Sequence, residues 1–374
     1  MIKIAYLVSS LMRGGPTNQL SYIIHKLDRS KYQPIIITLS PEREGNSQLN
    51  EFSEFNVEIY QLNLSRIKGI FTAKKKILDI LNKKKVDLVH SQGIRADMIS
   101  ANYLSKYKRV ATLRNYPYHD YLMTYGKFTG SIMSYLHIKA LKKLESANVC
   151  SKSVAEMLQV KINVRFNVVQ NGVRVDKYQI ADIKEKVSLR EKLSLPVDKK
   201  IFISVGLLND RKSPLILIDV MKKFTNAHLI FLGDGDLFEQ CNKAIFDIDN
   251  IDIVGFVNNV SDYLQASDYF ISASKSEGLP NTVMEAMACG LPSVLSDIPP
   301  HKEILNFDRR AGRIFELENA SDIYDKVNEV LELDYNSSAN YARRLVDNNL
   351  SSQAMSNKYQ SIYSKLINKK RSNL

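Results

Sequence analysis

The feature that most constrains this chain is a strand pattern followed by the loop and helix pattern S-K-S-E-G-L-P-N-T-V-M-E-A-M-A-C-G-L-P at residues 274–292. Residues 268–273 have the aromatic and β-branched content of a short buried strand. Residues 282–289 predict a helix, because a glycine follows at the position where helices commonly end. In the loop between them, Gly278 lets the backbone approach a ligand, and Pro280 stiffens the entry into the helix.

The chemistry of this loop indicates a ligand that carries both a phosphate and hydroxyl groups. At the start of the helix, where Asn281 or Thr282 is the candidate N-cap, free backbone N–H groups and the helix dipole favour an anion. Glu277 in the loop and Glu285 in the helix repel a phosphate, so we expect them to accept hydrogen bonds from sugar hydroxyls. A phosphate beside a polyol describes a sugar nucleotide.

The sequence around these two glutamates resembles a known signature. Glu277, seven residues, Glu285 and then Ala-Met-Ala-Cys-Gly-Leu-Pro resemble the E-x7-E pattern of the retaining glycosyltransferases of family 4, also called group 1. The spacing alone is weak, but the surrounding E-G-L-P and E-A-M-A-C-G-L-P make it specific; the alternative is a surface helix with an incidental glutamate at each end. The resemblance implies the GT-B fold, an α/β architecture in which two Rossmann-like domains with parallel sheets face each other across a cleft.

The resemblance covers almost the whole chain and implies two domains. Residues 1–168, together with a C-terminal helix at 352–374 that crosses back, are expected to form an acceptor domain, and residues 169–351 a nucleotide-sugar donor domain. A strand at residues 2–8, the pair Gly14-Gly15 and a helix form the entry unit of a doubly wound sheet. The resemblance places Gly14 on the acceptor side and Gly15 at the donor, and a plain tight turn is the alternative.

In the second domain, the segment V-G-L-L-N-D-R-K-S resembles the family's diphosphate-binding V-G-R-L-x-x-x-K-G segment. Leu207 stands where an arginine is usual, so Arg211 and Lys212 are expected to supply the positive charge; two surface cations are the alternative. The resemblance implies that Glu277 holds the donor sugar and Glu285 the ribose. The donor-binding residues predicted in this way are Glu285, Gly278, Leu279, Pro280, Asn281, Thr282, Gly206, Val257 and Gly15.

The predicted acceptor side rests on weaker matches. Val-Asp-Leu-Val-His90 resembles a family segment that places a histidine at a strand end, although a lone histidine there is more often structural. Many relatives carry T-x-H where this chain has Thr112-Leu-Arg114, so Arg114 is expected to steady the leaving phosphate or an anionic acceptor, unless it is a surface arginine. Asn115 follows it, and His119 is the candidate replacement for the missing imidazole.

We expect no metal and no cofactor. Asp234-Gly-Asp236 has the D-x-D spacing that holds Mn²⁺ or Mg²⁺ in other transferases, but here it follows a strand and matches the family's L-x-G-D-G turn. The donor is expected to be a nucleoside diphosphate sugar, most often UDP-linked, and the resemblance implies that cations and backbone amides stabilise its departing diphosphate.

The composition of the chain limits where in the cell the protein is expected and which partners it can bind. The chain of 374 residues has a net charge of +12, and residues 1–175 hold 27 Lys+Arg against 12 Asp+Glu, so one half is strongly basic. Three widely spaced cysteines fit a reducing cytoplasm. No signal peptide and no run of about 18 apolar residues is found, so we expect a cytoplasmic protein, soluble or peripheral at the inner face of the membrane.

Two basic segments favour contact with an anionic membrane. Residues 69–85 predict an amphipathic helix with Ile70, Ile77, Ile80 and Leu81 opposite lysines, and residues 131–143 place Met, Tyr and Leu opposite lysines. A solvated lysine face is the alternative for each segment. Nucleic-acid binding would also suit the charge, but we do not expect it.

Together these patterns predict a retaining transferase that moves a hexose-type sugar from a nucleoside diphosphate sugar to a hydroxyl of a lipid-linked or polysaccharide intermediate of capsule or exopolysaccharide synthesis. A non-hydrolysing sugar-nucleotide 2-epimerase, which shares the fold, is the enzymatic alternative. A GT-B protein that binds nucleotide sugar without turnover is the alternative from another class.

Overall fold

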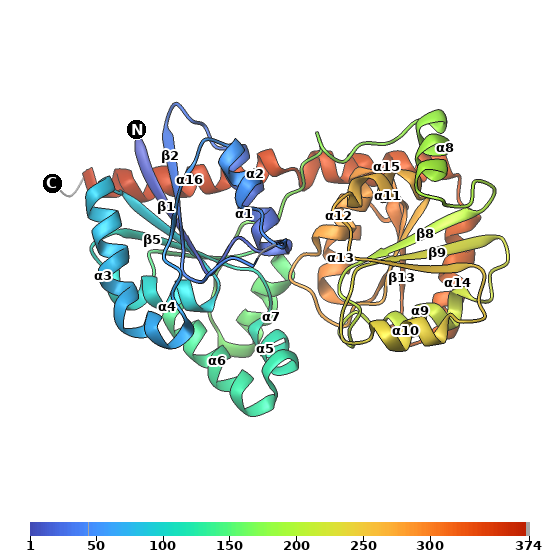
Figure 1. Ribbon diagram of the computed structural model, residues 1–374, viewed down its shortest axis with the longest axis horizontal. Coiled ribbons are helices and arrows are strands. Elements are labelled where there is room, and N and C mark those ends of the chain that lie inside the picture. Colours follow the sequence, from blue (N-terminus) through green and yellow to red (C-terminus); the bar gives the residue numbers. More distant parts are fainter. Residues whose placement is uncertain (44, 372–374) are drawn as a thin grey trace. The chain divides into compact units, whose positions relative to one another are not determined.

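The computed structural model describes residues 1–43 and 45–371, with the side chains of residues 66–71 and 369–371 left aside. The chain divides into two compact units (Figure 1). The first comprises residues 1–171 and the C-terminal segment that begins at Ser352, and the second comprises residues 172–351. The domain boundary expected after residue 168 falls at the end of strand β7, close to this division.

The first unit is built on a seven-stranded sheet with the strand order β3-β2-β1-β4-β5-β6-β7, in which every paired strand is parallel to its neighbour. The strands are β1 (Ile2–Val8), β2 (Tyr32–Thr38), β3 (Glu58–Gln61), β4 (Leu88–Gln92), β5 (Lys108–Leu113), β6 (Ser146–Val149) and β7 (Asn167–Val168). The helices are α1 (Gly15–His25), α2 (Leu49–Glu54), α3 (Arg66–Lys84), α4 (Ile94–Tyr103), α5 (Pro117–Tyr125), α6 (Lys127–Leu141), α7 (Lys152–Ile162) and α16 (Ser352–Arg371).

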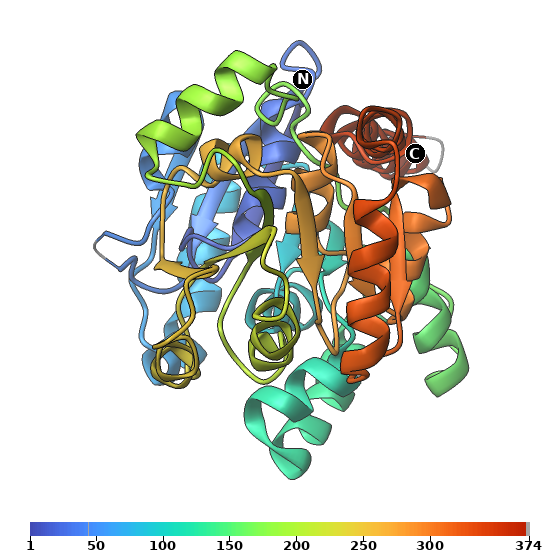
Figure 2. The same cartoon turned by 90° about the vertical axis from the view of Figure 1, so that its right-hand side faces the viewer.

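Strand β1 explains why this sheet is covered on both faces. Successive side chains of a strand point to opposite faces, and in β1 nearly all of them are apolar. Ile4 and Tyr6 pack into the core beneath α1 and α16, whereas Ala5 and Leu7 pack into the core beneath α3 and α4. The run therefore needs helices on both sides, which is what the βαβ connections supply (Figures 1 and 2).

The second unit repeats the plan with a six-stranded sheet, ordered β10-β9-β8-β11-β12-β13 and again parallel throughout its pairings. Its strands are β8 (Lys200–Val205), β9 (Ala227–Leu232), β10 (Ile251–Gly255), β11 (Tyr269–Ser272), β12 (Ser293–Ser296) and β13 (Gly312–Phe315). Its helices are α8 (Ile183–Lys192), α9 (Pro214–Met221), α10 (Phe238–Ala244), α11 (Val260–Ala266), α12 (Asn281–Ala288), α13 (Pro299–Leu305), η1 (Arg309–Ala311), α14 (Ala320–Leu331) and α15 (Tyr335–Asn349).

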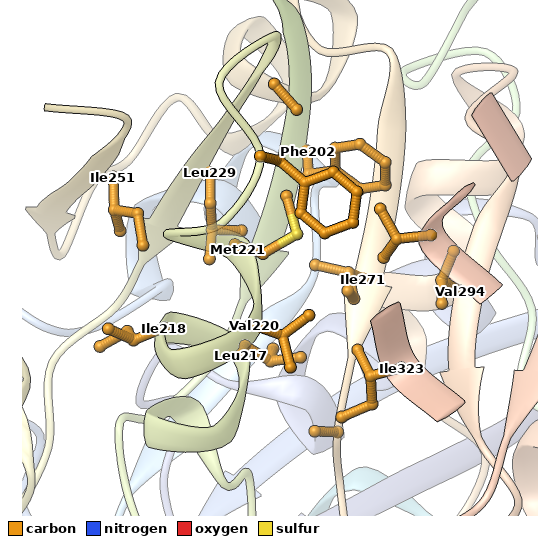
Figure 3. Close-up of a cluster of buried hydrophobic side chains, with 14 of the residues drawn as sticks. Phe202, Leu217, Ile218, Val220, Met221, Leu229, Ile251, Ile271, Val294 and Ile323 are labelled. Carbon is orange, nitrogen blue, oxygen red and sulfur yellow. The ribbon is translucent and has the colours of Figure 1, made fainter. Parts of the chain in front are cut away.

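The core of the second unit lies between this sheet and the helices α9, α10 and α14. Phe202 of β8 and Ile271 of β11 meet Leu217 of α9 and Ile323 of α14 there (Figure 3). The other face of the sheet carries α11 and α12 (Figure 1). The side chains predicted for the site in both units follow the ends of the packed strands or lie in the helices after them.

Helix α3 corrects one expectation about membranes. It covers the basic segment predicted as an amphipathic helix, but Ile77 and Leu81 are buried against the sheet and Ile80 is half-buried. Its apolar face is therefore part of the core and not a lipid-binding surface; Ile70 lies outside the described side chains. In the part of the chain that the structure describes, no helix is both long and apolar enough to cross a bilayer.

Candidate active site

Apart from Gly15, which lies in the first unit, the predicted donor residues follow strands of the second sheet or lie in α12. Glu277 follows β11, and its Oε1 lies 2.7 Å from Lys212 Nζ and 3.0 Å from Arg211 Nη1. Both cations stand in the segment after β8, and Arg211 Nη1 also donates to the Ser276 carbonyl at 2.8 Å. Because β8 and β11 are neighbours in a parallel sheet, the loops that follow them meet at one edge.

The charge state of Glu277 is set by these neighbours. Its side chain is 11% exposed, and burial alone would raise the pKa of its carboxyl. The Lys212 and Arg211 cations outweigh burial and lower that pKa to about 2. Glu277 is therefore an ionised carboxylate with two cations against one of its oxygens, and the positive charge is concentrated beside it.

A glycine is needed at position 206, where β8 ends, because the Lys212 side chain passes close to the Gly206 backbone. A Cβ at Gly206 would lie 2.9 Å from Lys212 Cε, and the residue has φ of +149°, which side-chain-bearing residues rarely adopt. Gly233, after β9, approaches even more closely: its Cβ would lie 1.9 Å from the Gly206 carbonyl oxygen. The two glycines let the strand ends close up and aim Lys212 at Glu277.

Helix α12 starts directly after the loop, as predicted, but its cap differs. The N-cap is Pro280 and no side chain caps the helix, so neither Asn281 nor Thr282 has the predicted capping role. Gly278, Leu279 and Pro280 are buried, and Asn281 and Thr282 are half-buried. No N-cap side chain therefore accepts a hydrogen bond from the backbone N–H groups in the first turn of α12, which suits an anionic ligand.

Glu285 and Val257 occupy the positions expected from the chain order. Glu285 lies in α12 and is 4% exposed; burial and this neighbouring carboxylate together raise the pKa of the Cys289 thiol. Val257 is half-buried just after β10, next to the exposed Phe256. The roles predicted for these two residues toward ribose and base stay predictions.

One buried imidazole near Glu277 was missed from the sequence. His301, in α13, is fully buried, and its Nδ1 lies 3.0 Å from the Ser296 carbonyl oxygen. Burial lowers the pKa of His301 to about 4, although the Glu277 carboxylate opposes the shift. The ring is therefore neutral at neutral pH with its proton on Nδ1, and Nε2 has no hydrogen-bond partner among the described residues. Such a nitrogen can accept a hydrogen bond from a ligand hydroxyl.

The first unit contains a cavity of about 330 Å³ at the carboxyl edge of its own sheet. It is lined by Gly14 after β1, by Gly93 after β4 and by Arg114 and Asn115 after β5. Gly15 is the first residue of α1, directly beyond Gly14. Gly14, Arg114 and Asn115 therefore lie together at this edge, where the doubly wound pattern predicted the glycine loop, and the donor role predicted for Gly15 stays a prediction.

Arg114 is held by neutral groups. Its Nε and Nη2 donate to Gln92 Oε1 at 3.2 and 3.1 Å, and Nη1 donates to Asn171 Oδ1 at 2.6 Å. Amide oxygens orient a guanidinium but do not neutralise it, so the cavity wall keeps a fixed positive charge. This suits the anion-binding role predicted for Arg114.

His90 does not reach this cavity. Its side chain is fully buried, with Nδ1 2.7 Å from the Tyr363 hydroxyl and Nε2 2.8 Å from Thr112 Oγ1. Burial and the nearby Arg114 cation lower the pKa of His90 to about 3, so the ring stays neutral. The structure gives His90 a role in seating α16 on the sheet, in place of the acceptor-side role predicted.

His119 is also displaced from its predicted role. It lies on the exposed surface of α5 with its ring against Tyr116, and it is not among the residues that line the cavity. The imidazole in the cavity wall is that of His137, from α6. His137 and its partners Asp97 and Tyr121 were not predicted, because their positions on α6, α4 and α5 form no local pattern.

In the Asp234-Gly-Asp236 turn, the first carboxylate forms a local hydrogen bond to the backbone. Asp234 Oδ1 accepts the Gly235 backbone N–H at 2.7 Å, as expected for a turn after β9. No set of three or more His, Cys, Asp or Glu side chains in the described part of the chain is arranged to hold a metal ion.

Two family profiles match the chain. The profile described as "Glycosyl transferases group 1" matches residues 170–350, and the profile described as "Glycosyltransferase Family 4" matches residues 13–177. The first contains the Glu277 site and the second contains the cavity with Arg114. The chain belongs to the group 1, family 4 glycosyltransferases.

Relatives of this glycosyltransferase agree with that assignment. It is 24% identical to the O-antigen biosynthesis glycosyltransferase WclY of Escherichia coli, over 98% of this chain and 99% of the relative. It is 26% identical to the UDP-Gal:alpha-D-GlcNAc-diphosphoundecaprenol alpha-1,3-galactosyltransferase of Escherichia coli, over 63% of this chain and 64% of the relative. The crystal structure of Anabaena Alr3699/HepE in complex with UDP-glucose superposes with a TM-score of 0.79 at 16% identity, covering 98% and 100% of the two chains. These likenesses confirm the GT-B fold of this glycosyltransferase.

Proposed function

We propose that this glycosyltransferase moves a sugar, with retention of anomeric configuration, from a UDP-linked donor to a hydroxyl of a cell-surface glycan intermediate. The observation that carries the proposal is the ionised Glu277 paired with Lys212 and Arg211 at the sheet edge before α12. The similarity to WclY and the fold shared with a UDP-glucose complex support it.

The chemistry follows from where charge develops. As the glycosidic bond to the diphosphate breaks, positive charge grows at the anomeric carbon and negative charge at the leaving oxygen. Lys212 and Arg211 would stabilise the diphosphate together with the N-terminal turn of α12. The diphosphate then competes with Glu277 for these cations, which frees the Glu277 carboxylate to accept hydrogen bonds from the donor sugar. Glu285 would hold the ribose.

We propose that this reaction proceeds without a metal ion, because two fixed cations already stand where the leaving group's charge appears. The acceptor would occupy the cavity of the first unit, where Arg114 offers a permanent positive charge. A phosphate-linked acceptor fits that charge, and one relative is described as acting on a diphosphoundecaprenol-linked sugar. We therefore propose a lipid-linked glycan intermediate as the acceptor.

Membrane contact is proposed through α6 and not through α3. Phe128, Ile132, Tyr135 and Leu136 are exposed on one side of α6, at spacings that share a helix face, while Ser134 and His137 on its other side are buried. Lys139 in the same helix and Lys142 and Lys143 directly after it add positive charge. An apolar face with flanking lysines suits the interface of an anionic membrane, which would place the enzyme at the inner face of the cell membrane.

The activity is tested by nucleotide release. The protein is incubated with UDP-, GDP-, ADP- and dTDP-sugars, with and without a synthetic N-acetylglucosamine–diphospho-lipid, in EDTA and in Mg²⁺. We expect UDP release that depends on the acceptor, is equal in EDTA, and yields a product whose anomeric configuration by NMR matches the donor. An epimerised sugar nucleotide without acceptor would indicate the epimerase, and binding without turnover would indicate a non-catalytic protein.

Membrane contact is tested by flotation with vesicles of phosphatidylcholine alone or with phosphatidylglycerol. We expect binding only to the anionic vesicles, and loss of binding in Phe128→Ser/Tyr135→Ser. Phe246→Ser is the matched control, because Phe246 is 86% exposed but lies in the second unit. Failure of the wild-type protein to float, or equal loss in the control, would contradict the proposal.

A further inference from the structure

A buried hydrogen-bonded chain ends at the wall of the cavity in the first unit. Ser91 Oγ donates to Asp97 Oδ1 at 2.6 Å, and Asp97 Oδ2 lies 2.8 Å from His137 Nε2. His137 Nδ1 in turn lies 2.7 Å from the Tyr121 hydroxyl. The Asp97 and His137 side chains are fully buried, whereas Tyr121 is half-buried and lines the cavity together with Arg114.

The bonding orders this chain of hydrogen bonds. The Asp97 carboxylate can only accept, so His137 carries a proton on Nε2 and donates it there. With one proton on the imidazole, His137 Nδ1 is an acceptor and the Tyr121 O–H donates to it. The single phenolic proton is committed to the protein interior, and the lone pairs of the Tyr121 oxygen are left to accept a hydrogen bond from elsewhere.

The packing of α5 on α6 keeps this chain rigid. At Gly130 of α6 an added Cβ would lie 2.5 Å from the Tyr121 carbonyl oxygen, so the two helices meet without any side chain between them. Ser134 Oγ donates to the Pro117 carbonyl at 2.9 Å, and the Tyr121 and His137 rings stack with their centroids 5.9 Å apart. Tyr121 is therefore preorganised, as a binding group should be.

We propose that the Tyr121 hydroxyl oxygen accepts a hydrogen bond from a hydroxyl of the acceptor substrate, and that His137 and Asp97 are positioning residues that fix its polarity. The inference rests on the proposed function and narrows it: the acceptor carries a hydroxyl for Tyr121 and an anionic group for Arg114, as a glycosyl phosphate does.

Tyr121 serves as an acceptor of hydrogen bonds and not as a base. Burial, with the Asp97 and Asp120 carboxylates nearby, raises the pKa of Tyr121 well above its ordinary value, so the phenol stays protonated. A site built to bond a hydroxyl discriminates strongly against a ligand that lacks it, because the polar group in the site is then left unpaired. Tyr121 is thus a specificity-determining residue for the acceptor.

The test measures binding of N-acetylglucosamine 1-phosphate to the intact chain by calorimetry, with UDP binding measured in parallel. We expect Tyr121→Phe, which keeps the ring, to weaken binding of the glycosyl phosphate roughly tenfold to hundredfold and to leave UDP binding unchanged. Tyr125→Phe is the matched control, because Tyr125 lies on the same helix and is exposed. No binding to the wild-type chain, or equal binding to Tyr121→Phe, overturns the inference.

Asp97→Asn tests the polarity directly. An amide can donate to His137 Nε2, which moves the imidazole proton to Nδ1 and turns the Tyr121 proton toward the cavity. We expect weaker binding than in the wild-type chain, by no more than the loss in Tyr121→Phe because a sugar hydroxyl can also accept a hydrogen bond, and no further weakening in the double variant, whereas a purely structural role predicts additive losses. Thermal denaturation of each variant shows that the fold persists. If UDP does not bind but N-acetylglucosamine 1-phosphate binds through Tyr121, the UDP-linked donor of the proposed function fails, whereas the hydroxyl-binding role of Tyr121 stands.

Discussion

In the proposed reaction Glu277 has two successive tasks: it first holds Lys212 and Arg211 in place and then accepts hydrogen bonds from the donor sugar. In the structure its carboxylate is held by Lys212 and Arg211, so three charged side chains keep fixed positions at the edge of the sheet. The lowered pKa means that the carboxylate keeps its charge throughout the physiological pH range. In the proposed reaction the donor diphosphate would meet cations that are already in place, and electrostatic preorganisation of this kind lowers a reaction barrier.

Replacing Glu277 with glutamine removes the charge and keeps the shape. We expect kcat to fall by the equivalent of about 2–4 kcal/mol, because the amide accepts weaker hydrogen bonds from the developing oxocarbenium sugar. Binding of UDP is expected to be retained or to tighten, because Lys212 and Arg211 lose their competing partner. Steady-state kinetics and calorimetry measure the two effects.

The matched control is Glu318→Gln, which removes an exposed carboxylate that pairs with Lys275 in the same unit. We expect wild-type kinetics from it. Near-wild-type turnover in Glu277→Gln would remove Glu277 from the site.

At the residue scale the sequence predicted the residues that lie in recognisable local motifs. Glu277 and its cations stand in segments whose spacing is itself a signal, so their convergence at one sheet edge followed from the parallel topology. Tyr121, His137 and Asp97 come from three helices, and only tertiary packing joins them. A structural His90 was the stated alternative, but its partner could not be foreseen because Tyr363 is far away in the chain.

Two helices that look alike in sequence have opposite surroundings. Both α3 and α6 place apolar side chains opposite lysines, but Ile77 and Leu81 of α3 pack on the sheet, whereas Phe128 and Tyr135 of α6 are exposed. In α6 the face toward the protein is formed partly by small and polar residues, including Gly130 and Ser134. Amphipathic periodicity predicts how wide an apolar helix face is, but it does not predict whether that face packs on the protein core or stays exposed.

The hydroxyl groups of α16 are expected to be important for its docking. Tyr363 bonds His90 Nδ1 at 2.7 Å and Tyr6 at 3.3 Å in a fully buried setting. Tyr363→Phe leaves the buried His90 nitrogen unpaired, so we expect the first unit to lose about 1–3 kcal/mol of unfolding free energy. Urea denaturation measures the loss, and Tyr135→Phe on the exposed face of α6 is the control. Equal stability of Tyr363→Phe and the wild-type chain would contradict the expectation.

For the whole molecule, the order of the central strands was predictable because strands such as β1 and β9 are nearly continuous apolar runs. The return of α16 to the first unit followed from the family resemblance and not from any pattern in the helix itself. Its tyrosines give no sign in the sequence of the His90 cluster that they cover.

Each unit contains a fully buried histidine whose pKa is lowered, His90 in the first unit and His301 in the second, and together these two make the stability of the molecule depend on pH. The pKa of His90 falls from 6.5 to about 3 and that of His301 from 6.5 to about 4, in both cases mainly through burial. Between these folded values and 6.5 the unfolded chain binds a proton that the folded chain does not. The contribution of each histidine to the free energy of unfolding is therefore fully present above about pH 6.5. It decreases as the pH falls, by roughly 1.4 kcal/mol per pH unit for each histidine.

Glu277 adds a separate loss at lower pH. Its folded pKa of about 2 lies below the ordinary 4.5, so its contribution is present above pH 4.5 and disappears as the pH falls toward 2. We expect urea denaturation followed from neutral pH to about pH 4 to show falling stability, with a shallower slope in His90→Gln and in His301→Gln. Because the two histidines lie in different units, each variant should flatten only the transition of its own unit. A slope that neither substitution changes would mean that other groups set the acid sensitivity.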